Sequence, residues 1–236
     1  MRINDTAYVA TQYETEAGLA ARKSVYRDVT GPDPREMALA AVLEDAPRRI
    51  LEVGCGEGEL AERLIDDADV VAVDQSPRMV ELTAERGVDA RVADAQELPF
   101  PDETFDVVLA AWMLYHVPDV DRALGEFARV LRPGGRLVAA TNGNDHLVEL
   151  LGLGGQTRWD LPFSAENGAK VLSRHFSSVE RRDARGTVTF RDIAMVRDYF
   201  GSSERLAPAI ERLPGSLEQP LVARRTPVVF VATKAA

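Results

Sequence analysis

Residues 50–60 read ILEVGCGEGEL, a short apolar run followed by three glycines at alternate positions and then by a helical pattern. Because glycine has no Cβ, the backbone at Gly54, Gly56 and Gly58 can turn sharply and let a bulky ligand lie against it. The dinucleotide pattern G-x-G-x-x-G would need glycine at position 59. Glu59 stands there, and its charge would oppose a pyrophosphate at the helix N-terminus. This loop therefore favours a ligand other than a dinucleotide.

The chain beyond the loop alternates apolar runs with helical patterns. Ser76-Pro77 supplies an N-cap and a proline at the first helical position. Alternation at this spacing predicts an α/β fold with a doubly wound, mostly parallel, Rossmann-like sheet and helices on both faces. The loops that follow its strands then meet along one edge, where such sheets bind ligands. Strands are expected at 50–53, 70–73, 90–92, 105–110 and 136–140. Helices are expected at 14–28, 35–45, 164–174 and 192–200. A further helix precedes the strand at 136–140 and is expected to end at Arg132-Pro133-Gly134-Gly135.

Two acidic residues follow strands at this edge. Asp74 lies twenty residues beyond Gly54, and a carboxylate there can accept hydrogen bonds from both hydroxyls of a ribose. Asp94 follows the third strand and could accept a hydrogen bond from an exocyclic amine of a ligand. The backbone beside Ala95 would then contact the ring that carries this amine. A turn residue or a helix cap is the alternative for either aspartate.

Composition limits the function further. The 236 residues, 45% of them hydrophobic, fit a single domain spanning 1–236. The 28 basic and 38 acidic side chains give a net charge of −10, which disfavours nucleic acid as a partner.

The lone Cys55, the lack of a signal peptide and the lack of a long apolar run predict a soluble, cytoplasmic protein without membrane contact. The three histidines show no metal-binding spacing, so no metal is expected. Nothing in the sequence indicates an oligomeric state.

Four segments taken in order resemble the class I S-adenosylmethionine-dependent methyltransferases, in the small-molecule type 11 group. They are ILEVGCGEGEL, VVAVD, ADAQELPFPDETFDVVLAAWMLYHVPD and RVLRPGGRLV, and the resemblance is close over residues 47–141. It implies a seven-stranded sheet whose last strand is antiparallel, with strands six and seven at 177–182 and 227–233. Residues 1–30 would then form an N-terminal lid, and 183–226 an insertion that shapes the substrate pocket.

The resemblance also implies a cofactor, S-adenosylmethionine, which leaves as S-adenosylhomocysteine. Cys55 is expected to pack inside the glycine loop and not to act as a nucleophile. The residues expected around the cofactor are Glu52, Gly54, Cys55, Gly56, Gly58 and Ala111 at the methionine half, Asp74, Gln75 and Met79 at the ribose and adenosine, Asp94 and Ala95 at the adenine, and Tyr13 and Arg22 from the lid.

On the acceptor side, His116 is the candidate general base, because it follows the fourth strand at the ligand-binding edge and histidine titrates near neutrality. Support of the cofactor pocket is the alternative role. The aromatic candidates for the substrate pocket are Tyr26, Tyr115, Trp159 and Tyr199, with Phe163 as a further one.

The sequence thus predicts direct in-line methyl transfer to oxygen, nitrogen or carbon of a small molecule. A sulfonium methyl is already activated, so the enzyme mainly has to position the acceptor. Three alternatives stay open: an NAD-dependent oxidoreductase, an aminopropyl transferase, and a regulatory protein that binds S-adenosylmethionine without catalysis.

Overall fold

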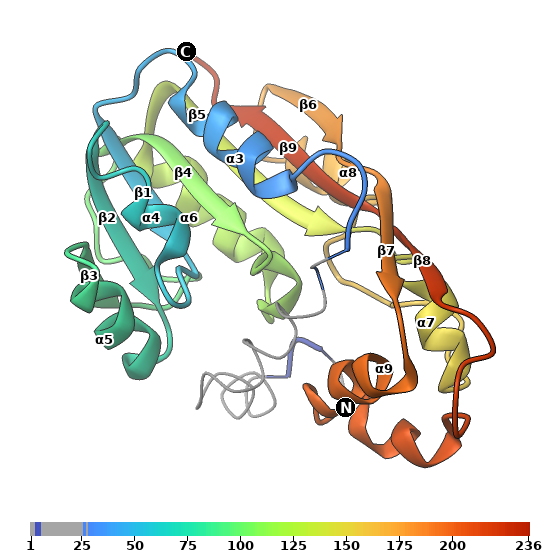
Figure 1. Cartoon of the computed structure of the whole chain (residues 1–236). Helices are drawn as coiled ribbons and strands as arrows, with labels where there is room; N and C mark the ends of the chain where they lie inside the picture. Colours follow the sequence, from blue (N-terminus) through green and yellow to red (C-terminus); the bar gives the residue numbers. More distant parts are fainter. Residues whose placement is uncertain (1–2, 6–25, 27) are drawn as a thin grey trace.

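A seven-stranded sheet of order β3-β2-β1-β4-β5-β9-β6 runs through the centre of the molecule (Figure 1). The computed structural model describes residues 3–5, 26 and 28–236, and all structural statements concern these residues. The strands of this sheet are β1 (Arg49–Val53), β2 (Asp69–Asp74), β3 (Asp89–Val92), β4 (Phe105–Ala111), β5 (Leu131–Asn142), β6 (Ser178–Asp183) and β9 (Pro227–Thr233).

Strand directions confirm the expected fold class. β1 to β5 pair in parallel, whereas β9 lies antiparallel between β5 and β6. β4 is buried along almost its whole length, as parallel strands are when helices cover both faces of their sheet. The last strand of the sheet is therefore antiparallel and the rest of the sheet mostly parallel.

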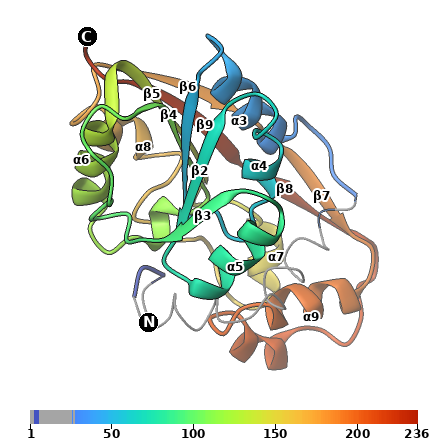
Figure 2. The ribbon, with the colours of Figure 1, turned by 90° about the vertical axis from the view of Figure 1, so that its left-hand side faces the viewer.

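Helices cover both faces of the sheet (Figures 1 and 2). Side chains alternate along β1, so Ile50 packs with α3 and α4 on one face, while Leu51 packs with α6 and α8 on the other. Among the described residues, no helix has the length and apolar character needed to cross a membrane. The helices named here are α3 (Pro34–Leu43), α4 (Glu59–Glu62), α5 (Pro77–Glu85), α6 (Val120–Val130) and α8 (Gly168–Leu172).

The junction of α6 and β5 differs from the expectation. α6 ends at Val130 and β5 begins at the next residue, Leu131, well before the expected start at 136. Leu131 pairs with Phe105, and the register then shifts before Arg136 pairs with Val107. The segment 132–135, read as a helix terminator, thus lies within β5 at an irregularity of the pairing, because proline and glycine disturb a ladder without ending the strand.

Residues between β6 and β9 form a smaller layer beside the main sheet, at the lower right of Figure 1. Its two strands, β7 (Gly186–Phe190) and β8 (Leu221–Arg225), pair antiparallel. Sequence reasoning expected a helix in this insertion but missed the two-stranded sheet. The other elements of this layer are α9 (Ile193–Gly201), the 3-10 helix η2 (Ala207–Arg212) and the preceding α7 (Val148–Leu153), which share a hydrophobic cluster that includes Leu150, Phe190 and Phe200.

The segment that precedes α3 is attached to this layer. Val29 bridges to Val188 of β7, and the Thr30 N–H donates to the Thr187 carbonyl at 2.9 Å. Gly186 permits this contact, since a Cβ there would lie 1.9 Å from the Thr30 oxygen. Most of the helix expected at 14–28 and most of the expected lid at 1–30 lie outside the described residues.

Candidate functional site

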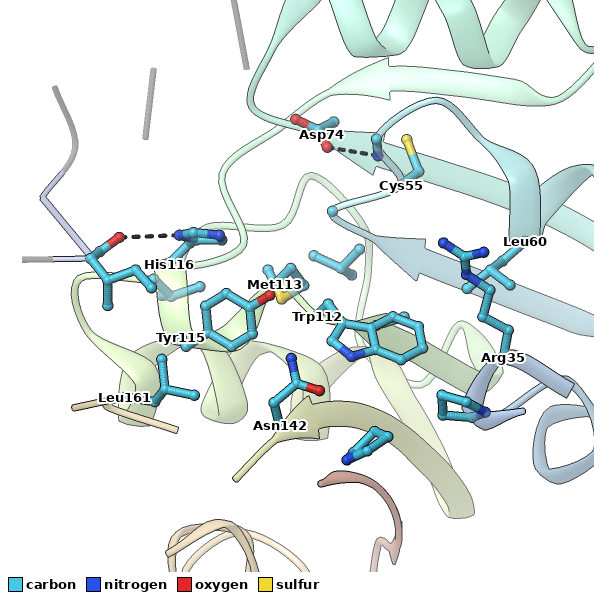
Figure 3. Close-up of a pocket in the computed structure, with 18 of the residues that line it drawn as sticks. Arg35, Cys55, Leu60, Asp74, Trp112, Met113, Tyr115, His116, Asn142 and Leu161 are labelled. Atoms are coloured by element: carbon cyan, nitrogen blue, oxygen red, sulfur yellow. Dashed lines mark hydrogen bonds between the residues drawn. The ribbon is translucent and has the colours of Figure 1, made fainter. Parts of the chain in front are cut away.

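A cavity of about 600 Å³ opens at the carboxyl ends of β1, β2 and β4. Its wall continues over the start of α3, the 3-10 helix η1 (Leu114–His116) and residues of the insertion. In Figure 3, the lining side chains extend from Asp74 and Cys55 at one end to Asn142 at the other. This is the edge at which doubly wound sheets bind ligands, and the volume lies in the usual range for small-molecule sites.

The glycine loop forms one end of the cavity. Gly54 has φ +73°, and its N–H donates to the Val73 carbonyl at 2.8 Å, which ties the loop to the end of β2. A Cβ on Gly54 would lie 2.7 Å from Cβ of Met113, so no larger residue fits without displacement of that wall. Glycine here therefore permits both the turn and the close approach of the segment that follows β4.

Asp74 is held rigidly at the end of β2. Its carboxylate accepts from the Gly56 N–H at 3.0 Å and from the Ser76 N–H at 2.9 Å. Burial raises the pKa of this carboxyl, and the backbone hydrogen bonds oppose that rise. A carboxylate offers about four lone-pair directions, and because Asp74 lines the cavity, the acceptor capacity that the backbone leaves is available to a diol there.

Glu52 carries the most perturbed carboxyl of the cavity wall. The side chain is buried in β1, and it accepts a hydrogen bond from the Ala61 N–H in the first turns of α4. Its Oε2 is buried and has no hydrogen-bond partner among the described residues. Burial, with a smaller contribution from the nearby Asp74, raises the pKa of Glu52 to about 8. The Oε2 atom of Glu52 is therefore suited to pair with a cationic group of a ligand.

Cys55 lies against α5 in the loop. Its Sγ is 3.4 Å from Oγ1 of Thr83, and that hydroxyl also donates to the Gly56 carbonyl at 2.9 Å. Burial raises the pKa of the thiol far above its ordinary value. The thiol is thus a packed, protonated group and not an activated nucleophile.

The third strand end supplies a turn that faces the same cavity. Oδ1 of Asp94 accepts from the Gln96 N–H at 2.8 Å and from Gln96 Nε2 at 3.1 Å, so the carboxylate is fixed within the turn. Ala95 is buried beside it, and all three residues line the cavity. Gln75, which follows Asp74, and Ala111 at the end of β4 also line it.

Three expected residues do not line the cavity. Met79 is fully buried on the inner face of α5, four residues before Thr83, because the helix turns this side chain away from the cavity. A Cβ on Gly58 would meet the Thr83 side chain at 2.8 Å, so Gly58 serves the packing of the loop on α5. Phe163 is fully buried against Phe230. Tyr13 and Arg22 lie outside the described residues.

His116 and Tyr115 project into the cavity from η1 (Figure 3). Nδ1 of His116 lies 3.1 Å from the Ile3 carbonyl oxygen. Because a carbonyl only accepts, Nδ1 carries the proton in this contact and Nε2 is the basic atom of the ring. The ring of Tyr115 lies edge-on to the imidazole at 4.5 Å between centroids, which restricts its rotation.

The far end of the cavity is lined by aromatic and polar side chains from β5, β8 and the insertion. His146 accepts from the Thr226 N–H at Nδ1, so Nε2 carries the proton that it donates to the Tyr26 hydroxyl at 3.0 Å. Burial, together with the nearby Arg225 charge, lowers the pKa of His146 to about 3, so this imidazole is neutral. Trp159 donates from Nε1 to the His146 carbonyl at 2.9 Å, and Tyr199 also lines this end.

Sequence reasoning missed several cavity residues. Asn142 ends β5 and His146 follows it, so the rule that located Asp74 and Asp94 could have located them. Trp112 directly follows β4 at φ +54°. The doublet Arg224-Arg225 is typical of a solvated surface, and this interpretation is wrong for Arg225, whose place in the cavity depends on the unexpected pairing of β7 with β8. Among the described residues, no group of three or more His, Cys, Asp or Glu could hold a metal ion.

Comparison with known proteins bears on the identity of this cavity. Residues 51–139 match the model of a family described as a methyltransferase domain, the type 11 group. The demethylmenaquinone methyltransferase of Thermus thermophilus is 43% identical over 113 residues, which cover 44% of this chain and 51% of that protein. The 27-O-demethylrifamycin SV methyltransferase of Amycolatopsis mediterranei is 46% identical over 99 residues, which cover 38% of this chain and 36% of that protein. The chain thus spans about half or less of the length of these relatives.

Solved structures share the fold over a longer stretch. A putative methyltransferase from Bacillus halodurans superposes with a TM-score of 0.67 at 18% identity, covering 86% of this chain and 99% of that one. The cyclase SpnF superposes with a TM-score of 0.66 at 18% identity, covering 100% of this chain and 97% of that one. These likenesses establish the fold, and a cyclase among them shows that the fold does not fix the chemistry. Together with the cavity at the glycine loop, they show a class I methyltransferase fold in which residues 51–139 match the methyltransferase domain of the type 11 group.

Proposed function

We propose that this chain transfers the methyl group of S-adenosylmethionine to a small-molecule acceptor. One observation carries the proposal. The Asp74 carboxylate, fixed by the Gly56 and Ser76 N–H groups, faces a cavity that the glycine loop bounds. That arrangement presents a rigid diol acceptor beside a glycine surface, as a nucleoside ligand requires.

The residues of the cavity fit this cofactor. The unpartnered Oε2 of Glu52 suits the α-ammonium of the methionine part, and Asp74 suits the ribose. Asp94, Ala95 and Gln96 form the wall where the adenine would lie. When bound, the cofactor supplies an activated sulfonium methyl group, so the protein has to orient the acceptor and exclude water.

His116 is the residue that we assign as general base for a protic acceptor. Its Nε2 is basic because Nδ1 bonds to the Ile3 carbonyl, and the ring lies on the cavity wall next to Tyr115. The aromatic residues of the far end, Tyr26, Trp159 and Tyr199, would bound the acceptor. The relatives are named for demethylmenaquinone and 27-O-demethylrifamycin SV, and those names support a small organic acceptor here.

We treat the chain as one catalytic unit in which the insertion shapes the acceptor end. Its residues Tyr199 and Arg225 line the same cavity as the glycine loop. An NAD-dependent oxidoreductase is disfavoured because Glu59 begins α4 where a pyrophosphate would need glycine. A regulatory protein would bind the cofactor equally well and differs only in the absence of turnover.

The experiment that tests this proposal is an acceptor screen with methyl-labelled S-adenosylmethionine. S-Adenosylhomocysteine release is measured by mass spectrometry across phenols, amines, carboxylic acids and quinols. The expected result is acceptor-dependent release that Asp74→Ala abolishes. Cofactor binding without release across the whole panel would favour the regulatory alternative, and no cofactor binding would refute both.

A further inference from the structure

Arg225 occupies an unusual position at the acceptor end of the cavity. It is the last residue of β8, where the small sheet continues through Thr226 into β9 of the main sheet. Its side chain lines the cavity, yet the residue is only 7% exposed. Among the described residues, no other arginine is buried to this extent.

The guanidinium of Arg225 has no carboxylate partner among the described residues. Nη1 donates to the Thr30 carbonyl at 3.1 Å, and Cζ lies 5.8 Å from the centre of the Tyr26 ring. Other poorly exposed arginines differ: Arg136 pairs with Glu44 at 3.1 Å, and Arg182 pairs with the same glutamate at 2.7 Å. Within the described part of the chain, Arg225 is therefore a buried arginine whose charge no carboxylate compensates.

An uncompensated buried guanidinium is costly. Arginine does not deprotonate in proteins, and removal of an ion from water without a counterion is strongly unfavourable. The face of a tyrosine and one hydrogen bond to a neutral carbonyl offset only part of this cost. Because Arg225 also faces a cavity, an anionic group of a ligand would supply the missing counterion.

The described neighbours of Arg225 supply no counterion for the guanidinium, so this role is left to an incoming ligand. His146 is neutral, and its Nε2–H donates to the Tyr26 hydroxyl, which fixes the tyrosine ring beneath the guanidinium. Asn142, whose backbone pairs with Pro227 beside Arg225, has a neutral amide. Asp74 lies at the glycine-loop end of the cavity, across from Asn142 in Figure 3. The buried Glu52 lies in β1, which leads into the glycine loop.

From this placement we propose that Arg225 binds a carboxylate of the methyl acceptor, so that the acceptor is a small organic acid. The planar fork of a guanidinium matches the two oxygens of a carboxylate. That carboxylate serves recognition and another atom receives the methyl group, because bidentate pairing reduces the nucleophilicity of both oxygens. The cavity would then hold a cationic cofactor at its acidic end and an anionic acceptor at Arg225. That the bound carboxylate belongs to the methyl acceptor rests on the proposed function, whereas the anion site itself does not.

The test uses the full chain and isosteric probe pairs. The pairs are benzoate and benzamide, cyclohexanecarboxylate and cyclohexanecarboxamide, and octanoate and octanamide, each with and without saturating S-adenosylhomocysteine. The chain has two tryptophans, and since Trp112 and Trp159 both line the cavity, intrinsic fluorescence reports occupancy without a label. We expect at least one carboxylate to bind at least tenfold more tightly than its amide.

Two variants at adjacent positions test whether Arg225 causes the preference for a carboxylate over its amide. Arg225→Gln should lose it, whereas Arg224→Gln should keep it, because Arg224 is exposed and already pairs with Glu149 at 2.7 Å. Arg225→Lys keeps the charge and should retain a weaker preference, which covers the case that Arg225→Gln fails to fold. The proposal is overturned if no carboxylate binds more tightly than its amide. Persistence of the preference in Arg225→Gln, or its equal loss in Arg224→Gln, would also overturn it.

The same titrations separate this proposal from the proposed function. Carboxylate preference at Arg225 without any binding of S-adenosylhomocysteine would refute methyl transfer and leave the anion site standing. Binding of S-adenosylhomocysteine that depends on Asp74, without carboxylate preference, would refute the anion site and leave methyl transfer standing.

Discussion

Replacement of Glu52 by glutamine should make the stability of the protein less sensitive to pH. The Glu52 carboxyl is buried, and one of its oxygens has no hydrogen-bond partner in the part of the chain that the structure describes. Burial raises its pKa from 4.5 to about 8, so the folded protein binds this proton more tightly than the unfolded chain does. The resulting stabilisation is fully present below pH 4.5 and is lost as the pH rises through 8. Glutamine has the same shape and cannot ionise.

The size of the effect follows from the shift. At about 1.4 kcal/mol for each pH unit, the folded wild-type protein loses roughly 3–4 kcal/mol relative to Glu52→Gln between pH 5 and pH 8. For a chain of this length, about 2–4 °C of Tm accompanies each kcal/mol, so the two melting temperatures should diverge by roughly 10 °C.

The assay is thermal unfolding of the ligand-free proteins, followed by circular dichroism at constant ionic strength from pH 5 to pH 8. A matched control is Glu85→Gln, on the exposed side of α5, whose Tm should follow that of the wild type at every pH. A Tm difference between wild type and Glu52→Gln that stays constant across this range would refute the account of the buried carboxyl.

Four further outcomes are expected. Binding of S-adenosylhomocysteine at pH 7 should release close to one proton, because its ammonium ionises Glu52, and calorimetry in buffers of different ionisation enthalpy should detect this in wild type but not in Glu52→Gln. Gly54→Ala should lower cofactor affinity at least tenfold in equilibrium titration, since its Cβ would lie 2.7 Å from Met113; unchanged affinity would show that the loop tolerates the displacement. Cys55→Ala should change cofactor affinity less than threefold, and the native thiol should react slowly with a thiol reagent at pH 8, because burial raises its pKa. His116→Ala should reduce turnover of a protic acceptor at least 100-fold with little change in cofactor affinity, and equal losses in both would remove the base assignment.

The sheet could be predicted from the sequence because its strands are local patterns. Runs of buried β-branched residues such as Val70–Val73 form β2 within one residue of the expected bounds. The two-stranded sheet was not predictable in the same way. β8, with sequence LVARR, alternates between partly exposed and buried residues and acquires its strand character only by pairing with β7.

The site also combines positions that local sequence patterns predict with positions that depend on how the elements pack. Asp74 and His116 follow strand ends, and strand ends of a parallel sheet meet at one edge, so their approach to a common cavity follows from topology. Met79 was misplaced because the resemblance gives its position in the chain, whereas the rotation of α5 decides which way the side chain points. Arg225 was missed because an arginine doublet is typical of a solvated surface, and only the fold shows that the second arginine is buried.

The measurement that tests the central claim most directly is calorimetric titration of the protein with S-adenosylhomocysteine, with NAD as the control ligand and Asp74→Asn as the control variant. The account predicts micromolar binding of S-adenosylhomocysteine and none of NAD. It also predicts a loss of at least about 30-fold in Asp74→Asn, because an amide cannot accept from two N–H groups and from a diol as a carboxylate does; a hydrogen bond to a charged group contributes about 2 kcal/mol. Tighter binding of NAD, or equal affinity of wild type and Asp74→Asn for S-adenosylhomocysteine, would contradict it.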